Sequence, residues 1–329
     1  MAQSNEIKDW ATKYRPQTLA EVVGQETNVK LLRAMLDKNQ LYDAMIFYGR
    51  SGCGKTTTAR CLVNEMDADK IELDAASNSS VEDVRNLIEV AGRFSLKAKE
   101  RIIIIDEAHA LSKAAWQALL KSIEEPQGRT HWIFCTTEYK ALPGTIKGRC
   151  HMFKYYSVPT ETLVAYSKKI LQKENAPQLS DLVLTQIVKE SKNQVRDTVK
   201  LLQICSQNNI DDLDKLSNYL QTPKTDGMAS FIKGVIEGDS KLAIRALHSI
   251  EINELEPWAR ALEEFIYAAL EDAYGISTLN LSAVVAQKVR EVTSRNDLKK
   301  FGKLLDKLLY IRNNSEAFQQ LYILAATGV

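Results

Sequence analysis

One short stretch has the residue types and spacing of a phosphate-binding loop. Glycines there allow a tight curl in which backbone N–H groups point inward at phosphate oxygens, and the following helix start adds positive potential. A buried strand over 44–48 and a helix over 57–64 supply the context that this motif requires, which disfavours a loop that merely turns the chain. The sequence therefore predicts a nucleoside triphosphate site built from Gly49, Ser51, Gly52, Cys53, Gly54, Lys55, Thr56 and Thr57. Lys55 would reach the β- and γ-phosphates, and Thr56 would bind Mg²⁺.

A second chemical feature is the carboxylate pair Asp106-Glu107, which follows a run of four isoleucines. Asp106 at a strand end can hold Mg²⁺ through water, and Glu107 can polarise the water that attacks the γ-phosphate. Acidic pairs also occur in solvated turns, but a phosphate loop about 50 residues upstream favours the catalytic interpretation. We therefore expect the site to hydrolyse ATP.

Three other side chains are weaker candidates from their positions alone. Thr137 follows the apolar run 132–136 and could orient the lytic water, although threonines are common in strands. Arg149 could reach a neighbouring subunit's nucleotide, or it could be an ordinary surface residue. Arg196 starts a predicted helix, from which it could contact the γ-phosphate.

The pattern of apolar residues predicts the elements that must position these side chains. Strands over 71–73, 101–105 and 132–136 alternate with helices over 81–91 and 113–124, which predicts an α/β domain. The unbroken isoleucine run favours a parallel sheet that is sandwiched by helices. After residue 157, the apolar residues recur only at helical spacing. We predict an ATPase domain over 1–157, a small helical lid over 158–222 and an all-helical domain over 223–329.

Composition restricts the class of protein. The hydrophobic content of 45% supports folded cores, and 43 basic against 42 acidic residues leave nucleic-acid binding to a local patch or a multi-subunit surface. The five cysteines form no Cys-x-x-Cys pair, which disfavours a zinc site and fits a reducing compartment. No apolar run approaches the roughly 20 residues that span a bilayer, and no signal peptide is visible. We expect a cytoplasmic protein with no membrane contact.

Further motifs, in order along the chain, make it resemble the AAA+ ATPase subunits of DNA sliding-clamp loaders over about residues 10–205. Within that family it is most similar to the bacterial gamma/tau type, with replication factor C small subunits and phage loaders also similar. The motifs that carry the resemblance are Lys13-Tyr14-Arg15-Pro16, Val22-Val23-Gly24-Gln25, Asp74-Ala75-Ala76-Ser77-Asn78, Asp106-Glu107-Ala108-His109, Leu119-Leu120-Lys121-Ser122-Ile123-Glu124-Glu125-Pro126, Cys135-Thr136-Thr137 and Val195-Arg196-Asp197.

The resemblance implies a role for each matching residue, with ATP and Mg²⁺ as ligands. Thr137 would be the first sensor, Arg196 the second, and Arg149 a finger acting in trans. The adenine side would be held by Tyr14, Arg15, Pro16, Val22 and Val23. Gly148 replaces the usual serine before the finger and would loosen that loop. The short stretch 61–71 lacks the cysteine-rich zinc module usual in gamma/tau, which suits a divergent bacterial or phage-encoded loader.

The resemblance also implies partners: a sliding clamp, primer-template DNA and other loader subunits in a pentamer, homomeric or heteromeric, joined by a collar over 223–329. Arg85 and Lys113 are candidates for DNA phosphates, but solvated surface charges are nearly as good an interpretation. Phe94 is a candidate clamp contact, although a phenylalanine tucked under its own loop is the better-supported alternative.

Two rival functions share some of these motifs. A branch-migration helicase would typically append a winged-helix domain, and residues 228–329 lack the strand and turn signals of a wing. A non-enzymatic loader subunit would usually have a broken phosphate loop or lack the catalytic glutamate, whereas Lys55, Thr56 and Glu107 are all present. The ATP-hydrolysing loader subunit is therefore favoured.

Overall fold

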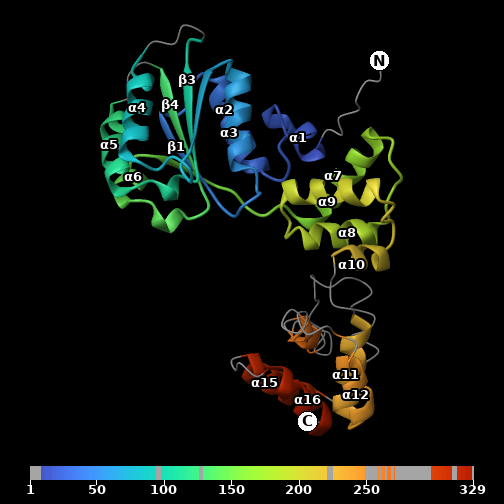
Figure 1. Cartoon of the computed structure of the whole chain (residues 1–329). Helices are drawn as coiled ribbons and strands as arrows, with labels where there is room; N and C mark the ends of the chain where they lie inside the picture. Colours follow the sequence, from blue (N-terminus) through green and yellow to red (C-terminus); the bar gives the residue numbers. More distant parts are fainter. Residues whose placement is uncertain are drawn as a thin grey trace, which may run out of the picture. The chain divides into compact units, whose positions relative to one another are not determined.

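The computed structural model describes residues 9–93, 98–125, 129–220, 225–248 and 250, short pieces at 258–259, 261–263, 265–267 and 270, and residues 298–312 and 317–327. They fall into two compact units. The first comprises Met1–Leu179 with Ile187–Asn209, and the second Ser180–Gln186 with Ile210–Val329. Figure 1 labels the elements. The three-part division over 1–157, 158–222 and 223–329 remains a prediction.

The described elements alternate between strand and helix in the first half of the chain and are helical afterwards. The strands are β1 (Ala44–Tyr48), β2 (Asp69–Asp74), β3 (Arg101–Asp106), β4 (Thr130–Thr136) and β5 (His151–Lys154). The helices up to residue 147 are α1 (Trp10–Lys13), η1 (Leu19–Glu21), α2 (Glu26–Asp37), α3 (Lys55–Met66), α4 (Val81–Ala91), η2 (Ala108–Ala110), α5 (Lys113–Glu124), η3 (Tyr139–Ala141) and α6 (Gly144–Lys147). The later helices are α7 (Thr160–Lys173), α8 (Asp181–Glu190), α9 (Val195–Gln207), α10 (Leu213–Leu220), α11 (Thr225–Glu237), α12 (Ser240–His248), α15 (Leu298–Arg312) and α16 (Ala317–Thr327).

The five strands form one parallel sheet in the order β2-β3-β4-β1-β5. Tyr48 at the end of β1 lies opposite Thr136 at the end of β4, and Ile105 on β3 lies opposite Phe134 on β4. Because neighbouring parallel strands end at the same edge, the phosphate loop, the acidic pair and Thr137 all leave the sheet there. The predicted α/β fold is confirmed.

Helices cover both faces of this sheet because successive β3 side chains point in opposite directions. Ile103 and Ile105 join one core with α4, α5 and α6, and Ile102 and Ile104 join a second core with α2 and α3. Figure 1 shows these two helix layers on either side of the sheet. All four isoleucines are fully buried, and each burial contributes about 1.5–3 kcal/mol. The isoleucine run lacks alternation because both of its faces are covered.

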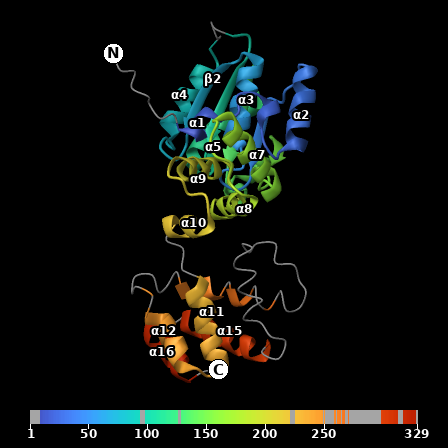
Figure 2. The same cartoon turned by 90° about the vertical axis from the view of Figure 1, so that its right-hand side faces the viewer.

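The second unit has a core of its own. α11, α12 and α16 pack together, and α15 contacts α16. Figure 2 shows these helices side by side within that unit. Phe231 and Trp258 meet edge to face with ring centroids 5.4 Å apart, and Phe301 is fully buried in the same core. Across the described part of the chain, no helix is both long and apolar enough to cross a membrane.

Candidate active site

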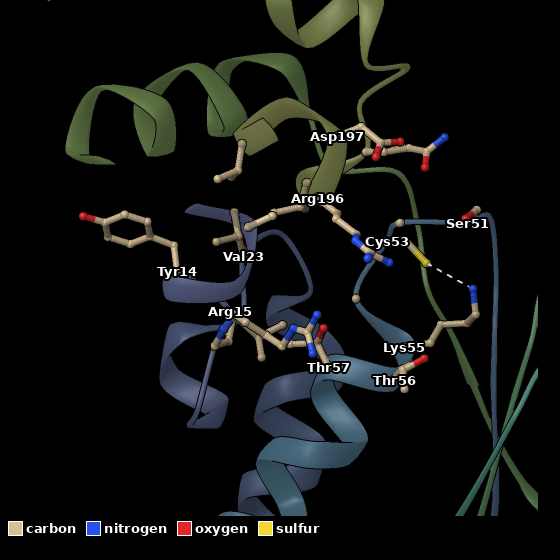
Figure 3. A pocket seen from close by; sticks show the side chains of 18 of the residues that line it. Tyr14, Arg15, Val23, Ser51, Cys53, Lys55, Thr56, Thr57, Arg196 and Asp197 are labelled. Atoms are coloured by element: carbon tan, nitrogen blue, oxygen red, sulfur yellow. Dashed lines mark hydrogen bonds between the residues drawn. The ribbon is translucent and has the colours of Figure 1, made fainter. Parts of the chain in front are cut away.

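A cavity of about 570 Å³ in the first unit collects the predicted nucleotide residues. Figure 3 shows how these side chains lie around it. Its lining includes Tyr14, Arg15, Pro16, Val22, Val23, Ser51, Gly52, Cys53, Gly54, Lys55, Thr56, Thr57, Asp106, Glu107 and Arg196. Gly49 contributes through its carbonyl, which accepts a hydrogen bond from Lys55 Nζ at 2.9 Å. Segments far apart in the sequence therefore converge on one site.

Two glycines of the phosphate loop lie where a side chain would clash. Gly52 has φ +70°, and a Cβ there would lie 2.7 Å from Gln194. Gly49 has φ +155°, and a Cβ there would meet the Tyr155 carbonyl oxygen at 2.3 Å. The Val195 N–H donates to the Gly52 carbonyl at 3.3 Å, so α9 starts against the loop. This contact brings Arg196 to the cavity.

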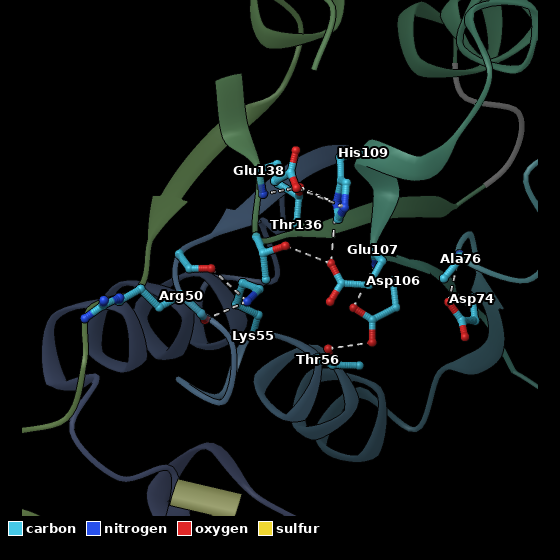
Figure 4. Close-up of polar contacts among 12 residues, drawn as sticks. Arg50, Lys55, Thr56, Asp74, Ala76, Asp106, Glu107, His109, Thr136 and Glu138 are labelled. Carbon is cyan, nitrogen blue, oxygen red and sulfur yellow. Dashed lines mark hydrogen bonds and ion pairs between the residues drawn. The ribbon is translucent and has the colours of Figure 1, made fainter. Parts of the chain in front are cut away.

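Lys55 is buried at 6% exposure and held against its own loop. Its Nζ donates to the Gly49 and Arg50 carbonyls, each at 2.9 Å, and lies 4.0 Å from Cys53 Sγ. Figures 3 and 4 show the ammonium from two sides. Burial raises the pKa of Cys53, so its thiol stays protonated and packs as a small apolar group. The lysine is positioned by backbone oxygens before any phosphate binds.

Thr56 and Asp106 form the pair expected to hold Mg²⁺. Thr56 Oγ1 donates to Asp106 Oδ2 at 2.8 Å, joining the start of α3 to the end of β3 (Figure 4). Burial raises the pKa of Asp106, and the Thr56 hydrogen bond opposes that shift. Hydroxyl and carboxylate oxygens are the hard ligands that Mg²⁺ prefers, so the residues present fit this ion.

The predicted catalytic Glu107 is fixed at its backbone and at its side chain. It has φ +45°, and its N–H donates to Asp106 Oδ1 at 3.0 Å. Thr137 Oγ1 donates to Glu107 Oε2 at 3.2 Å. The predicted general base and first sensor are thus direct neighbours, although Thr137 itself does not line the cavity.

The adenine-side candidates lie on a segment tied to the helices that follow the sheet. The Trp10 N–H donates to Gln203 Oε1 at 2.8 Å, and Tyr166 Oη donates to the Tyr14 carbonyl at 3.0 Å. The Tyr14 hydroxyl turns away from the phosphate loop and donates to Glu174 (Figure 3). Burial and the Glu174 contact both raise the pKa of Tyr14, which therefore stays neutral.

Three arginines cluster at the cavity, one more than the sequence analysis predicted. Burial lowers the pKa of Arg15, and the charges of Arg60 and Arg196 lower it further. Arg60, which the sequence analysis did not single out, lies one turn beyond Thr56 on α3 and pairs with Glu72. Its spacing of four residues from Thr56 was the only signal available. Such a concentration of positive charge suits a polyanionic ligand.

The remaining candidates lie away from the cavity or outside the described residues. Arg149 is 40% exposed, donates through Nε to Glu124, and contacts the Thr145 carbonyl at 2.8 Å. Arg85 on α4 and Lys113 on α5 are exposed, and Phe94 is not among the described residues. The finger, DNA and clamp roles therefore remain predictions.

A polar cluster beside Glu107 was also missed. His109 Nδ1 lies 3.4 Å from Glu107 Oε2 and 3.2 Å from Thr136 Oγ1, and His109 Nε2 lies 3.9 Å from Glu138 Oε1. Figure 4 shows these side chains together. The only sequence signal was a histidine two residues after the predicted catalytic glutamate. Its approach to β4 depends on strand order, which a single sequence does not reveal.

Comparison with known proteins places this site in a protein class. A family model described as "DNA polymerase III, delta subunit" matches residues 67–159. The gamma/tau subunit of DNA polymerase III from Mycoplasma genitalium is 30% identical over 79% of this chain and 49% of its own length. The gamma/tau subunit from Mycobacterium bovis is 33% identical over 58% of this chain and 37% of its own length. The chain thus spans half or less of these two relatives.

A shorter relative and a set of solved structures complete the comparison. The DNA polymerase III gamma subunit of Buchnera aphidicola subsp. Acyrthosiphon pisum is 27% identical over 89% of this chain and 87% of its own length. The RuvB Holliday junction branch migration motor of Thermotoga maritima has a TM-score of 0.55 at 19% identity over 74% of this chain and 90% of its own. This likeness shows the fold alone. The chain has the AAA+ P-loop fold, and in sequence it is similar to the gamma and tau subunits of bacterial DNA polymerase III.

Proposed function

We propose that this chain is the Mg²⁺-dependent ATP-hydrolysing subunit of a bacterial-type DNA sliding-clamp loader. The observation that carries the proposal is that Lys55, Thr56, Asp106, Glu107 and Thr137 converge at one sheet edge, in a chain similar to gamma/tau subunits. ATP binding would drive clamp opening and binding of primer-template DNA. Hydrolysis would release the closed clamp on DNA in the cytoplasm of a bacterial cell.

The chain's own groups support hydrolysis at this edge. Lys55 and the loop N–H groups neutralise phosphate charge, and Arg15 and Arg196 add cations on the opposite wall. Glu107 accepts a proton from the attacking water, which Thr137 helps to orient. Bound Mg²⁺ would supply further charge neutralisation, with Thr56 and Asp106 as its protein ligands. Before the chemical step, phosphate would have to replace the loop carbonyls that hold Lys55, and Mg²⁺ would have to replace the hydrogen bond between Thr56 and Asp106.

A trans-acting finger would make the site incomplete in a single subunit. Arg149 does not line the cavity of its own chain, whereas Lys55 does. We place Arg149 against the nucleotide of a neighbour in a pentamer that the second unit helps to hold together. Arg85 and Lys113 would contact DNA phosphates without reading sequence, and Phe94 would contact the clamp.

Mixing two inactive variants tests both the site and the finger. Lys55→Ala removes nucleotide binding but leaves the finger, and Arg149→Ala removes the finger but leaves the nucleotide site. Each alone should lose about 10³-fold in ATP turnover. A mixture should recover turnover, because some interfaces then combine an intact site with an intact finger. A matched Lys147→Ala variant, two residues from the finger, should retain activity by itself.

Two outcomes separate this proposal from its rival. Recovery on mixing, with turnover that depends on a sliding clamp and primed DNA, supports the loader. Full activity of Arg149→Ala alone contradicts the trans finger. The alternative is a DNA motor such as a branch-migration helicase, because the RuvB motor shares the fold of this chain without sharing much of its sequence. That alternative predicts turnover stimulated by branched DNA and indifferent to a clamp.

A further inference from the structure

We propose that His109 is the positioning residue for Glu107: it holds one carboxylate oxygen of the catalytic glutamate so that the other faces the attacking water. This inference rests on the proposed ATPase function and deepens it. His109 comes from η2, directly after β3, and its ring lies beside the end of β4 (Figure 4). It does not line the nucleotide cavity, so it would act through Glu107 rather than on the nucleotide.

The contacts to Glu107 are unequal between its two oxygens. Oε2 accepts from Thr137 Oγ1 at 3.2 Å and lies 3.4 Å from His109 Nδ1. Within the described part of the chain, no hydrogen bond reaches Oε1. A carboxylate anchored through one oxygen can present the other as a base without giving up its anchor. The Thr137 hydrogen bond and the nearby His109 ring together restrict rotation of the glutamate, whose backbone is already held at φ +45°.

The histidine ring is itself fixed from β4. Thr136 is fully buried, and its Oγ1 accepts the Glu138 N–H at 3.0 Å while lying 3.2 Å from His109 Nδ1. The Thr136 oxygen already accepts one hydrogen bond and retains a lone pair for a second. A proton on Nδ1 satisfies that oxygen and the nearby carboxylate together, whereas a bare Nδ1 would face Glu107 with a lone pair. We take the tautomer with a proton on Nδ1, which places that proton between Thr136 Oγ1 and Glu107 Oε2.

Glu138 approaches the His109 ring from the other side. Its Oε1 lies 3.9 Å from His109 Nε2, and its side chain is 66% exposed. A contact this long and this exposed contributes little. We therefore expect Glu138→Gln to change turnover less than two-fold. Thr136 and Glu107 are the partners that matter.

The test uses single-turnover ATP hydrolysis in the full chain with its clamp and primed DNA. His109→Ala should lower the chemical rate about ten-fold or more while the Kd for ATP stays within two-fold, because a misplaced base slows only the chemical step. His109→Asn keeps a donor near the Nδ1 position and should recover most of the rate. His109→Gln places its amide near Nε2 instead and should not.

A double-mutant cycle shows whether His109 acts through Glu107. In a Glu107→Gln background, adding His109→Ala should change the residual rate less than two-fold, because the positioned group is already gone. A ten-fold loss in that background would overturn the inference, and so would no loss from His109→Ala alone. His131→Ala, which removes a histidine at the other end of β4, is the control for general destabilisation and should retain the chemical rate in folded protein.

These measurements separate the inference from the function on which it rests. If wild-type turnover does not depend on Glu107, the proposed ATPase mechanism fails. If it does depend on Glu107 but Asn and Gln at position 109 behave alike, only the positioning role fails.

Discussion

The two ends of the central sheet carry similar charged and polar residues, but these residues make different contacts. At the amino end, Arg101 pairs with Asp69 at 2.9 Å and donates to the Arg93 carbonyl at 2.7 Å. His131 there donates to the Tyr42 carbonyl at 3.0 Å and lies 3.7 Å from Glu100. These groups satisfy one another and close the end of the sheet.

At the carboxyl end, hydrogen bonds leave selected atoms available. Lys55 and Asp106 are held at cavity walls by neighbours that a bound nucleotide or ion can replace. Arg15 is half-buried beside two other arginines, an arrangement that a polyanion would relieve. Polar groups alone therefore do not mark a site. What distinguishes this end is a cavity lined by charged side chains that are not all neutralised by ion pairs. The cavity lies at the carboxyl edge of the strands, where parallel sheets bind ligands.

The largest effect should come from removing the proposed base, Glu107, at the carboxyl end of the sheet. Glu107→Gln should lower kcat about 10³-fold while ATP binding is retained, because Gln preserves size but cannot accept the proton. Single-turnover hydrolysis and equilibrium ATP binding measure the two quantities. Hydrolysis retained in Glu107→Gln would contradict the assignment of the catalytic base to the carboxyl end of the sheet.

The matching change at the amino end should act on stability instead. Arg101→Met leaves Asp69 without its principal partner in a largely buried setting, and should destabilise the fold by about 3 kcal/mol. Urea unfolding measures this loss. Turnover per folded molecule should be unchanged. A loss of kcat without a loss of stability would contradict the claim that the amino end of the sheet serves stability alone.

Glu72 on β2 offers an intermediate case, because it holds Arg60 at the cavity wall. Burial acts to raise the pKa of Glu72, but the contacts with Arg60 and, to a lesser extent, Lys70 together outweigh it and leave the pKa below its ordinary range. The folded state therefore favours the ionised form, so the pair stabilises above the unfolded pKa of about 4.3 and that contribution is lost as pH falls through the folded pKa. Glu72→Gln should cost about 1 kcal/mol at pH 7.

The pH dependence of unfolding checks that sign. The gap in unfolding free energy between wild type and Glu72→Gln should narrow as the pH is lowered from 5 toward 3. A gap that widens on acidification would contradict the assigned ion pair.

The smallest effect concerns the loop before Arg149. Gly148 has φ −72°, and a Cβ there would meet only the Gly144 and Thr145 carbonyl oxygens at 3.7 and 3.9 Å. Serine should therefore fit without strain, and Gly148→Ser should raise stability by about 0.5 kcal/mol by restricting the unfolded chain. A thermal melt measures this gain, and a loss of stability would show that the glycine is required.

Local patterns predicted much of the fold, and they failed where structure depends on distant partners. Helices over 81–91 and 113–124 and the strand after Arg101 emerged from periodicity and apolar runs, because both local signals agree with the final packing. β5 was not predicted, since only Phe153 of its four residues is buried on this edge strand. Residues 10–37, which contain α1 and α2, were likewise not assigned.

The same division applies to the site. The phosphate loop and Asp106-Glu107 could be read from the sequence because each is contiguous. Two other contacts could not be predicted, because they depend on which strands lie side by side, and a single sequence does not reveal the strand order. These are the contacts of Arg60 with Glu72 and of His109 with Thr136. The proposed role of Arg149 requires a neighbouring subunit, so neither a local pattern nor a contact within this chain predicts it.

The central claim is best tested by steady-state ATP turnover in wild type and Arg149→Ala, with and without a cognate sliding clamp and primed DNA. The account predicts that clamp and DNA together strongly stimulate wild type, and that Arg149→Ala loses the stimulation while still binding ATP. Turnover that ignores the clamp but rises with branched or duplex DNA would contradict it.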